Sequence, residues 1–418
     1  MNLSLAIVLA AGLAVLYLAW RRPTNLLAIV VASLAIGPQW ILARYLRAGL
    51  LALATPLHKA LLIVAMAAHA WQFGLRRGIV NWPLLAVVWL ALQSLLLADL
   101  EPRLTLRLMA FAALDLALPW TLVHLVVAPG TRARYALLLA LLAAGCVASG
   151  VALHLMEIRG AYYGSASRGL RLHGASNAGW LACLAFAGFA IALHEAVQRR
   201  HLGFAGLAAA NLVIAVLTGG RMGVGACLVL AVAYLGSAAL PAPAGIDRRA
   251  SLAFGIGSAL GLLLLGASLV RGFGIENVDD AFSLTARESI WASHFEAFRE
   301  SPIFGRGLGA GALGVNYYQL PHNDYLRLLV EGGVVGLVVY GVAVALWGWR
   351  VLALVAPGER GFVRALFLAL AVYALTDNIL TMVPALVPFL YLALILGEPE
   401  PGRSDAPGTP GGVTAGPC

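Results

Sequence analysis

The sequence predicts an all-α polytopic membrane protein, and three observations carry that prediction. Of the 418 residues, 61% are hydrophobic and only 11% are charged. The mean hydropathy is +0.88, whereas a soluble domain is about half apolar and about a quarter charged. Apolar stretches long enough to cross a bilayer recur along the whole length, which is typical of a chain that crosses the membrane many times.

About twelve apolar stretches have the length of a transmembrane helix. The first has no basic residue before it and no small-residue cleavage site after it, so we expect a retained helix and not a removed signal peptide. The last contains Pro384 and Pro388, which allow it to form two short helices. The expected spans lie near 3–20, 24–43, 57–74, 80–98, 104–127, 134–155, 175–196, 202–219, 222–240, 251–270, 325–347 and 362–397.

The connections between the spans predict an orientation. Arginines fall in alternate short loops, which the positive-inside rule assigns to the cytoplasm. The longer loops 156–174 and 271–321 and the tight turn at Arg221 then face the opposite side. We therefore expect one transmembrane domain over residues 1–397, followed by a Pro/Gly-rich tail, 398–418, whose composition predicts disorder.

The large loop has an internal pattern of its own. Thr285 and Glu288 stand at the spacing of a capping box, and Pro302 closes the segment. Between them, apolar residues recur at helical spacing, which predicts an amphipathic helix over 285–300, on the membrane face or over a cavity. The glycine-rich run that follows, FGRGLGAGALG, is interpreted as a hinge. It lacks the Lys and Ser/Thr of a P-loop.

Arginine is the dominant basic residue, since Lys59 is the only lysine among 28 basic side chains. The planar guanidinium suits phosphate recognition better than an ammonium does. A cation at membrane depth faces a cavity or a counter-charge, so arginines near one membrane boundary suit a pyrophosphate at headgroup level. The arginines that topology does not explain are Arg159, Arg168, Arg171, Arg221, Arg271, Arg287, Arg299 and Arg306.

His322 is the candidate catalytic residue. It stands where the last loop enters a membrane helix, with Pro321 before it and Asn323 and Asp324 after it. The two polar neighbours are candidates for orienting the imidazole, and Asp324 can alternatively cap the helix. Histidine is the commonest general base. A capping or interfacial histidine is the alternative interpretation.

Other chemistries have less support in the sequence. There is no HExxH, no Asp-x-Asp and no carboxylate pair at ligand spacing, so we predict neither a metal site nor a cofactor. The four cysteines form no CxxC pair. No G-x-S-x-G elbow is present. The basic residues are spread over loops on both faces, so we do not expect nucleic acid as a partner.

Four motifs resemble those of the O-antigen ligase and polymerase superfamily. PHNDYLRLLVEGGVVGL resembles its histidine followed by a helix with Glu and glycines, and RESIWASHFEAFRESPIFGRGLG resembles its Arg…Trp…Pro-x-x-Gly-x-Gly run. RLHGASNAGWLA resembles its Arg-x-x-Gly…Asn element, and LTGGRMGVG its Thr-x-Ser-Arg turn, with glycine in place of the usual serine. The matching residues are Arg171, Gly174, Asn177, Arg221, Arg287, Trp291, Pro302, Gly305, Gly307, His322, Asn323, Glu331, Gly333 and Gly336.

The resemblance implies a GT-C-type membrane glycosyltransferase of the bacterial inner membrane, with its active site facing the periplasm. In the ligase branch, the O-antigen polysaccharide passes from undecaprenyl pyrophosphate to a sugar hydroxyl of the lipid A–core oligosaccharide. The implied reaction is metal-independent and inverting. The resemblance assigns the general base to His322 and the pyrophosphate contacts to Arg171, Arg221 and Arg287. Arg168, three residues before Arg171, is a further candidate for binding the pyrophosphate.

Three other functions stay open at this point. An O-antigen polymerase would use another lipid-linked glycan as acceptor, and a protein O-glycosylating relative would use a protein. A transporter of lipid-linked oligosaccharides belongs to a different class altogether. Transporters usually show repeated halves and helices broken at the midplane. This chain has no visible repeat, and its polar residues concentrate on one face, which favours an enzyme.

Overall fold

The computed structural model describes residues 13–37, 40, 54–76, 78–165, 169–238, 285–313 and 320–398. Within this part of the chain, helices dominate, and the strands form one antiparallel hairpin. A further helical stretch covers residues 13–21. The elements are α2 (Pro23–Ile36), α4 (Ala54–Phe73), α5 (Trp82–Leu96), α6 (Leu106–Val123), α7 (Thr131–Leu155), β1 (Tyr162–Ser165), β2 (Gly169–Leu172), α8 (Ala178–Arg199), α9 (Leu202–Leu217), α10 (Arg221–Ala238), α13 (Thr285–Glu300), η2 (Ala310–Ala312), α14 (Asp324–Leu354), η3 (Pro357–Glu359), α15 (Arg360–Ala374), η4 (Ile379–Thr381), η5 (Val383–Ala385) and α16 (Leu386–Gly397).

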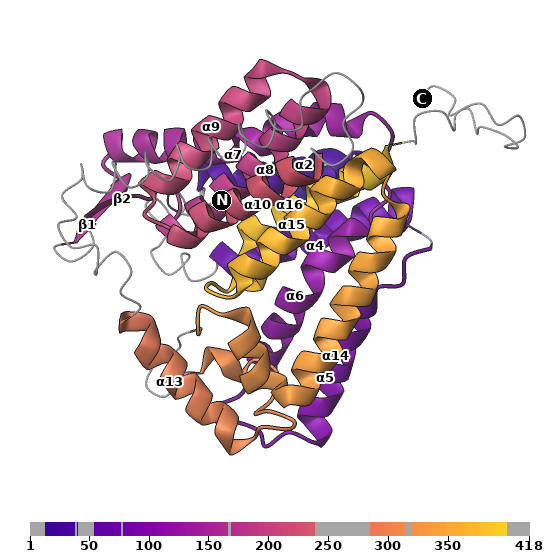
Figure 1. Ribbon diagram of the computed structural model, residues 1–418, viewed down its shortest axis with the longest axis vertical. Coiled ribbons are helices and arrows are strands. Elements are labelled where there is room, and N and C mark those ends of the chain that lie inside the picture. Colours follow the sequence, from indigo (N-terminus) through magenta and orange to yellow (C-terminus); the bar gives the residue numbers. More distant parts are fainter. Residues whose placement is uncertain are drawn as a thin grey trace, which may run out of the picture.

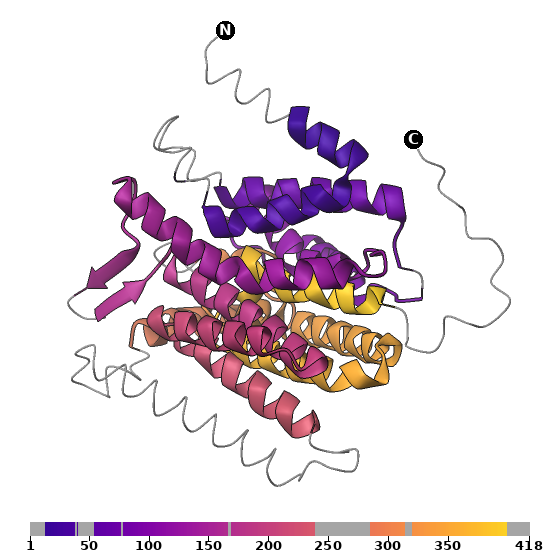
Figure 2. The ribbon, with the colours of Figure 1, turned by 90° about the horizontal axis from the view of Figure 1, so that it is seen from above.

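The helices are arranged in layers. Helix α2 packs on α4 and α7, α7 packs on α8, and α8 packs on α9 and α10 (Figure 2). Helices α5 and α14 run side by side along one flank, while the β1–β2 hairpin and α13 lie on the other side of the molecule (Figure 1). The structure is thus a membrane-type bundle with two peripheral elements.

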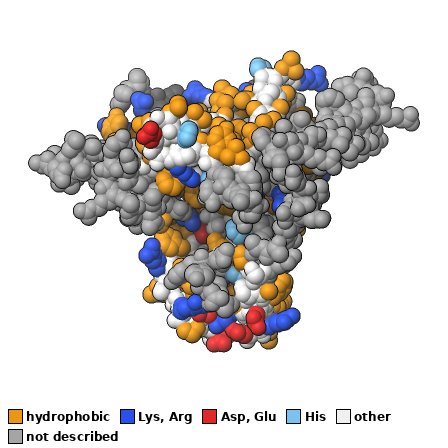
Figure 3. Space-filling view, turned by 90° about the vertical axis from the view of Figure 1, so that its left-hand side faces the viewer, with side chains coloured by type: hydrophobic (Ala, Val, Ile, Leu, Met, Phe, Trp, Pro, Cys, Tyr) orange, Lys and Arg blue, Asp and Glu red, His pale blue; other side chains and the backbone are white. Residues whose placement is uncertain are grey.

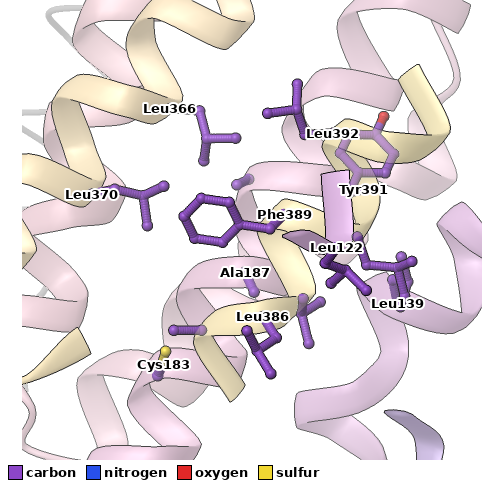
Figure 4. Close-up of a cluster of buried hydrophobic side chains, with 14 of the residues drawn as sticks. Leu122, Leu139, Cys183, Ala187, Leu366, Leu370, Leu386, Phe389, Tyr391 and Leu392 are labelled. Atoms are coloured by element: carbon purple, nitrogen blue, oxygen red, sulfur yellow. The ribbon is translucent and has the colours of Figure 1, made fainter. Parts of the chain in front are cut away.

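Helix α16 forms the centre of this bundle. Every residue from Leu386 to Leu396 is buried, and a helix that is apolar on all sides belongs inside a protein or a membrane. Around Phe389, side chains from α6, α7, α8 and α15 close the core (Figure 4). The labelled contributors are Leu122, Leu139, Cys183, Ala187, Leu366, Leu370, Leu386, Tyr391 and Leu392.

The predicted all-α membrane architecture is confirmed for the described residues. Four helices there, α6, α7, α8 and α14, are long and apolar enough to cross a membrane, and five more are apolar but shorter. The expected span near 251–270, the start of the first span and the tail 399–418 lie outside the described residues. The count of about twelve spans stays a prediction.

The last predicted span divides into two helices, as its prolines allow. Helix α15 ends at Ala374 and α16 begins at Leu386. The connection between them contains the short helices η4 and η5 and carries Asp377 and Asn378. Both of these polar residues are buried. The sequence interpretation allowed for this break but gave its polar residues no role.

Helix α14 is also divided, at a position that hydropathy did not predict. Gly333 has φ 63° and ψ −165°, and it separates a buried first segment from a longer second one. A Cβ at this position would lie 2.2 Å from the carbonyl oxygen of Ile303. Only glycine combines that backbone conformation with such close contact.

The arginine-bearing short loops gather at one end of the bundle, here called the basic end. Arg132 pairs with Glu359 at 2.7 Å, Arg76 donates to the carbonyl of Leu396 (2.8 Å), and Arg350 donates to that of Gly78 (2.9 Å). Helices α8, α10 and α14 begin at the opposite end. We call this the site end, because the candidate site residues that the structure describes lie there.

Candidate functional site

His322 occupies the turn that leads into α14. Its φ of 50° lies in the left-handed region, which residues other than glycine adopt rarely and at a cost of about 1 kcal/mol or more. Nδ1 of His322 lies 3.0 Å from Oδ1 of Asp377. The imidazole is 41% exposed, whereas the carboxylate is only 11% exposed. The pair is therefore anchored in the protein on the Asp377 side and open on the imidazole side.

Asp377 is a site residue that the sequence reasoning missed. It lies 55 positions after His322 in the connection between α15 and α16. Its Oδ1 also accepts the backbone N–H of Asn378 at 3.0 Å. The available signal was an acidic residue inside an apolar stretch, because charges at membrane depth are rare and usually functional.

This pairing sets the chemistry that the imidazole can perform. When Nδ1 donates its proton to the carboxylate, the lone pair remains on Nε2. The carboxylate also stabilises the imidazolium that forms once Nε2 accepts a proton. A base held by an orienting carboxylate is the arrangement that general-base catalysis uses.

Asn323 fixes the start of α14. Its Oδ1 accepts the backbone N–H of Leu326 at 3.0 Å, so Asn323 and not Asp324 makes the side-chain N-cap contact. The backbone N–H of Asn323 donates to Oδ1 of Asn378 at 3.1 Å. Asn323 therefore holds the segment that carries Asp377, through its contacts with Asn378 and with the first turn of α14.

Asp324 holds the same segment from the other side. It is 3% exposed, and its Oδ2 accepts the backbone N–H of Leu380 at 3.0 Å. Three consecutive residues, His322 to Asp324, thus bind Asp377, Asn378 and Leu380 in turn. This set of contacts explains why a histidine, an amide and a carboxylate stand together at this boundary.

The glycine-rich segment after α13 completes the broken helix α14. The backbone N–H groups of Arg306 and Gly307 donate to the carbonyls of Val330 and Glu331, at 2.8 and 3.1 Å. Gly305 lies so close to α14 that a Cβ there would be 2.6 Å from the Glu331 carbonyl. Backbone groups freed at membrane depth require such partners. The glycines therefore dock this segment against α14, which differs from the expected hinge.

Gln93 of α5 joins the same contact from the opposite side. Its Nε2 donates to the carbonyls of Phe304 (2.9 Å) and Gly332 (2.8 Å). One buried amide thus ties the docked segment to the helix break. The Pro-x-x-Gly-x-Gly run at 302–307 and the Glu–Gly–Gly at 331–333 of α14 are therefore parts of one structural unit, which positions His322.

Helix α13 covers the range 285–300 that the amphipathic pattern predicted, and it contacts the turn of His322. Nε1 of Trp291 donates to the carbonyl of Pro321 at 2.6 Å. The segment after α13 is held by Arg306, which pairs with Glu101 (2.7 Å) and Glu300 (2.5 Å). Acidic and basic side chains gather at this lower end of the molecule (Figure 3).

Arg171 lies against the turn that leads into Arg221, at the site end. Arg171 is on β2, and Arg221 is the first residue of α10. A Cβ on Gly219, two residues before Arg221, would lie 3.1 Å from Nε of Arg171. The turn is stabilised by Thr218, whose Oγ1 accepts the N–H of Gly220 at 3.0 Å. Glycine is thus needed where Arg171 crosses this turn.

The first turns of α8 connect these arginines to the His322–Asp377 pair. A Cβ on Gly220 would lie 2.8 Å from Cβ of Ala182, and a Cβ on Gly179 would lie 3.8 Å from Cε of Met382. Met382 belongs to the same connection as Asp377. Helix α8 therefore contacts both the turn before Arg221 and the connection that carries Asp377.

Arg168 and Arg287 cannot be added to this geometry. Arg168 lies outside the described residues, and at Arg287 the structure describes the backbone of α13 but not the side chain. The segment that precedes Arg171 forms a strand of the hairpin, paired as Tyr163 with Arg171.

The region around Arg171 is electropositive. Burial lowers the pKa of His173, and the nearby charges of Arg159 and Arg171 lower it further. A neutral imidazole flanked by two guanidinium groups leaves net positive charge at this surface. Helices α8, α10 and α14 also begin at the site end, and helix N-termini favour anions.

Buried ion pairs lie inside the bundle. Arg327 pairs at 2.9 Å with Glu331, the glutamate of the motif that begins at Pro321. Lys59 pairs with Asp115. All four side chains are at least nine-tenths buried. In the described part of the chain, no group of three or more His, Cys, Asp or Glu side chains is arranged to hold a metal ion.

Taken together, the fold and the site define a polytopic membrane protein with a histidine–carboxylate pair at one end of its bundle, where Arg171 and Arg221 also lie. Comparison with known families gives the next step: residues 205–341 match the family described as O-antigen ligase, Wzy_C. This match supports membership of the O-antigen ligase superfamily and confirms the resemblance found in the motifs. No curated protein matches the chain.

The matched region contains part of the site. It includes Arg221, α13, the docked glycine segment, His322 and Glu331. Arg171 precedes it and Asp377 follows it. The family match and the contacts of the structure therefore contribute different residues to the same site end. The family indicates activity of the O-antigen ligase or polymerase kind in glycan biosynthesis.

Proposed function

We propose that the protein is an O-antigen ligase, a GT-C-type glycosyltransferase of the bacterial inner membrane. It transfers the O-antigen polysaccharide from undecaprenyl pyrophosphate to a sugar hydroxyl of lipid A–core oligosaccharide on the periplasmic side. The observation that carries the proposal is the His322–Asp377 pair, 3.0 Å apart and open on the imidazole side. It lies at the end of the bundle where Arg171 meets the turn before Arg221.

The proposed reaction is a single displacement. Nε2 of His322 takes the proton of the acceptor hydroxyl while that oxygen attacks the anomeric carbon. The bond from the anomeric carbon to the pyrophosphate oxygen breaks, and its electron pair leaves with the pyrophosphate. Attack from the face opposite the leaving group inverts the anomeric centre. Asp377 balances the charge of the imidazolium while it exists.

The arginines act on the leaving group. Negative charge builds on the pyrophosphate as the bond breaks, and fixed cations that face it lower the barrier. Arg171 and Arg221 supply two planar guanidinium groups for this purpose, and Arg287 is proposed as a third from α13. Because guanidinium groups supply the positive charge, we expect activity without a divalent cation.

Helix α13 is proposed to cover the site. The hydrogen bond from Trp291 to the carbonyl of Pro321 connects it to the turn of His322. Water that reached the donor would compete with the acceptor and hydrolyse it. A cover attached to the catalytic turn would reduce that side reaction.

The test is a reaction with purified components. The protein in detergent is incubated with lipid-linked O-antigen and lipid A–core, with chelator and without ATP, and the products are separated on a gel. Ligated lipopolysaccharide is the expected product. Longer lipid-linked glycan would identify a polymerase instead. Movement of the intact donor across vesicle membranes without any glycan transfer would identify a transporter.

A further inference from the structure

Arg159 lies just after α7, and the function proposed above gives it no role. Its guanidinium stacks on the ring of Trp40, with Cζ 3.8 Å from the ring centroid. Nε1 of Trp40 donates to the carbonyl of Ala175 (2.8 Å), and Nη1 of Arg159 donates weakly to the same oxygen (3.4 Å). A guanidinium carries five N–H donors, so most of them remain available beyond this contact.

Residues 171–176, which include Ala175, the hydrogen-bond partner of Arg159, run beside α7. The backbone N–H of Ala175 donates to the carbonyl of Cys146 at 2.9 Å, and a Cβ on Gly150 would lie 2.3 Å from the carbonyl carbon of Gly174. Cys146 precedes the end of α7, Leu155, by nine residues, or about 13 Å along the axis. Irregular backbone at such depth is tolerated only inside protein or beside a polar cavity.

The side chains of residues 171–176 differ in burial. Gly174, Ala175 and Ser176 are buried against α7, whereas Arg171 and His173 remain partly accessible. Arg159 is also only partly buried. Within residues 171–176 the accessible side chains are therefore basic, as is that of Arg159. This composition is expected at the edge of an anion site.

No carboxylate of the described residues forms an ion pair with Arg159. The ion pairs found there involve other arginines, such as Arg132, Arg306 and Arg327. Burial lowers the pKa of Arg159, which reflects the cost of holding this cation away from water. Such a cation is normally offset by a counter-charge or faces a cavity. A bound anion would supply that counter-charge.

We propose that Arg159, held flat by Trp40, binds a phosphate of the lipid-borne diphosphate beside Arg171. This inference rests on the proposed function, because the diphosphate is that of the proposed glycan donor. Arg159 and Arg171 both lie near enough to His173 for their charges to lower its pKa. Stacking presents the planar edge of the guanidinium in one orientation, which a lysine ammonium does not reproduce.

The test compares Arg159→Gln and Arg159→Lys with Arg134→Gln. Arg134 is an exposed arginine near the start of α7, whereas Arg159 follows the end of that helix, so Arg134→Gln is a matched control. Glycan transfer is measured in nanodiscs of neutral phosphatidylcholine and again with phosphatidylglycerol added. We expect both Arg159 variants to raise the KM for the donor roughly 10- to 100-fold, the loss typical of a charge-assisted hydrogen bond. The kcat and the KM for the acceptor should change little.

Binding of inorganic diphosphate gives a readout that needs no activity. Calorimetric titration of the full-length protein should show weaker binding in both Arg159 variants and unchanged binding in Arg134→Gln. If the wild-type protein binds diphosphate through Arg159 but transfers no glycan, the proposed function fails and this site stands. If transfer is normal in Arg159→Gln and binding is unchanged, the site is overturned and the proposed function stands.

Two further outcomes are decisive. An effect of Arg159→Gln that occurs only with phosphatidylglycerol would overturn the donor assignment, since the phosphate would then come from a phospholipid headgroup. If Arg159→Gln does not fold, Arg159→Lys decides the question, because it keeps the charge and loses the stacked fork. Trp40→Leu should reproduce part of the KM increase, and full donor affinity in that variant would contradict the role of the stack.

Discussion

The pairing of His322 with Asp377 makes Asp377→Asn an informative perturbation. Asparagine has nearly the same size, and its Oδ1 can still accept the proton on Nδ1, so the 3.0 Å contact can persist. The substitution removes only the negative charge. It therefore tests whether Asp377 stabilises the imidazolium that forms when His322 accepts the acceptor proton, beyond holding the ring in place.

The geometry sets the size of the effect. Two unit charges 3.0 Å apart interact by about 5 kcal/mol at an effective dielectric of about 20 and by about 1.4 kcal/mol in bulk water. The imidazole is 41% exposed and the carboxylate 11% exposed, so a value of about 2–4 kcal/mol is reasonable. This corresponds to a loss of roughly 30- to 1000-fold in kcat.

The assay is steady-state glycan transfer with donor and acceptor varied in turn. We expect Asp377→Asn to lower kcat by that factor while the KM for the donor stays within about threefold, since the carboxylate acts on the imidazolium and not on the pyrophosphate. Asp99→Asn is the matched control, because Asp99 is exposed and forms no hydrogen bond or ion pair with the described residues. A kcat for Asp377→Asn within threefold of wild type would refute the reasoning.

Three further predictions concern the arginine site, the helix break and the basic end. Arg221→Lys should lower transfer roughly 10- to 100-fold although the charge is kept, because lysine lacks the planar fork; equal rates would contradict a bidentate contact. Gly333→Ala should lower the free energy of unfolding by about 3 kcal/mol or more, from its positive φ and the contact with Ile303. In thermal unfolding of the purified protein, Gly341→Ala, which meets nothing within 4 Å, should leave Tm unchanged or slightly raised. Burial would raise the pKa of Glu359, but its interactions with His194 and Arg132 lower it to about 2 from 4.5. It therefore stabilises the fold above pH 4.5 by about 3 kcal/mol, a contribution that fades as the pH falls toward 2. The Tm difference between wild type and Glu359→Gln should shrink over that range, and a constant difference would contradict the pairing.

The sequence predicted elements whose cause is local. Helix α13 follows from a capping-box spacing and apolar residues at helical period, and it was found at Thr285–Glu300. The division between α15 and α16 was anticipated from the prolines, of which Pro384 lies in the connection, whereas Pro388 lies inside the first turn of α16. Most membrane helices were located in the same way, because burial in lipid or protein requires long apolar segments.

The features that were missed depend on contacts between distant segments. The break of α14 at Gly333 exists because the segment around Gly305 and Gly307 supplies backbone hydrogen bonds from another part of the chain. Asp377 reaches His322 only because two irregular turns meet, and hydropathy reports neither turn. The region around Arg171, which was expected to be a loop, forms a β-hairpin.

The central claim is that His322 is the base of a glycan transfer from a lipid-linked donor to lipid A–core. The most direct test compares purified wild-type protein with His322→Ala at saturating donor and acceptor, in the presence of chelator. We predict ligated lipopolysaccharide from the wild type and a kcat at least about 100-fold lower for the variant, with donor binding retained. Full activity of His322→Ala in a correctly folded protein would contradict the account.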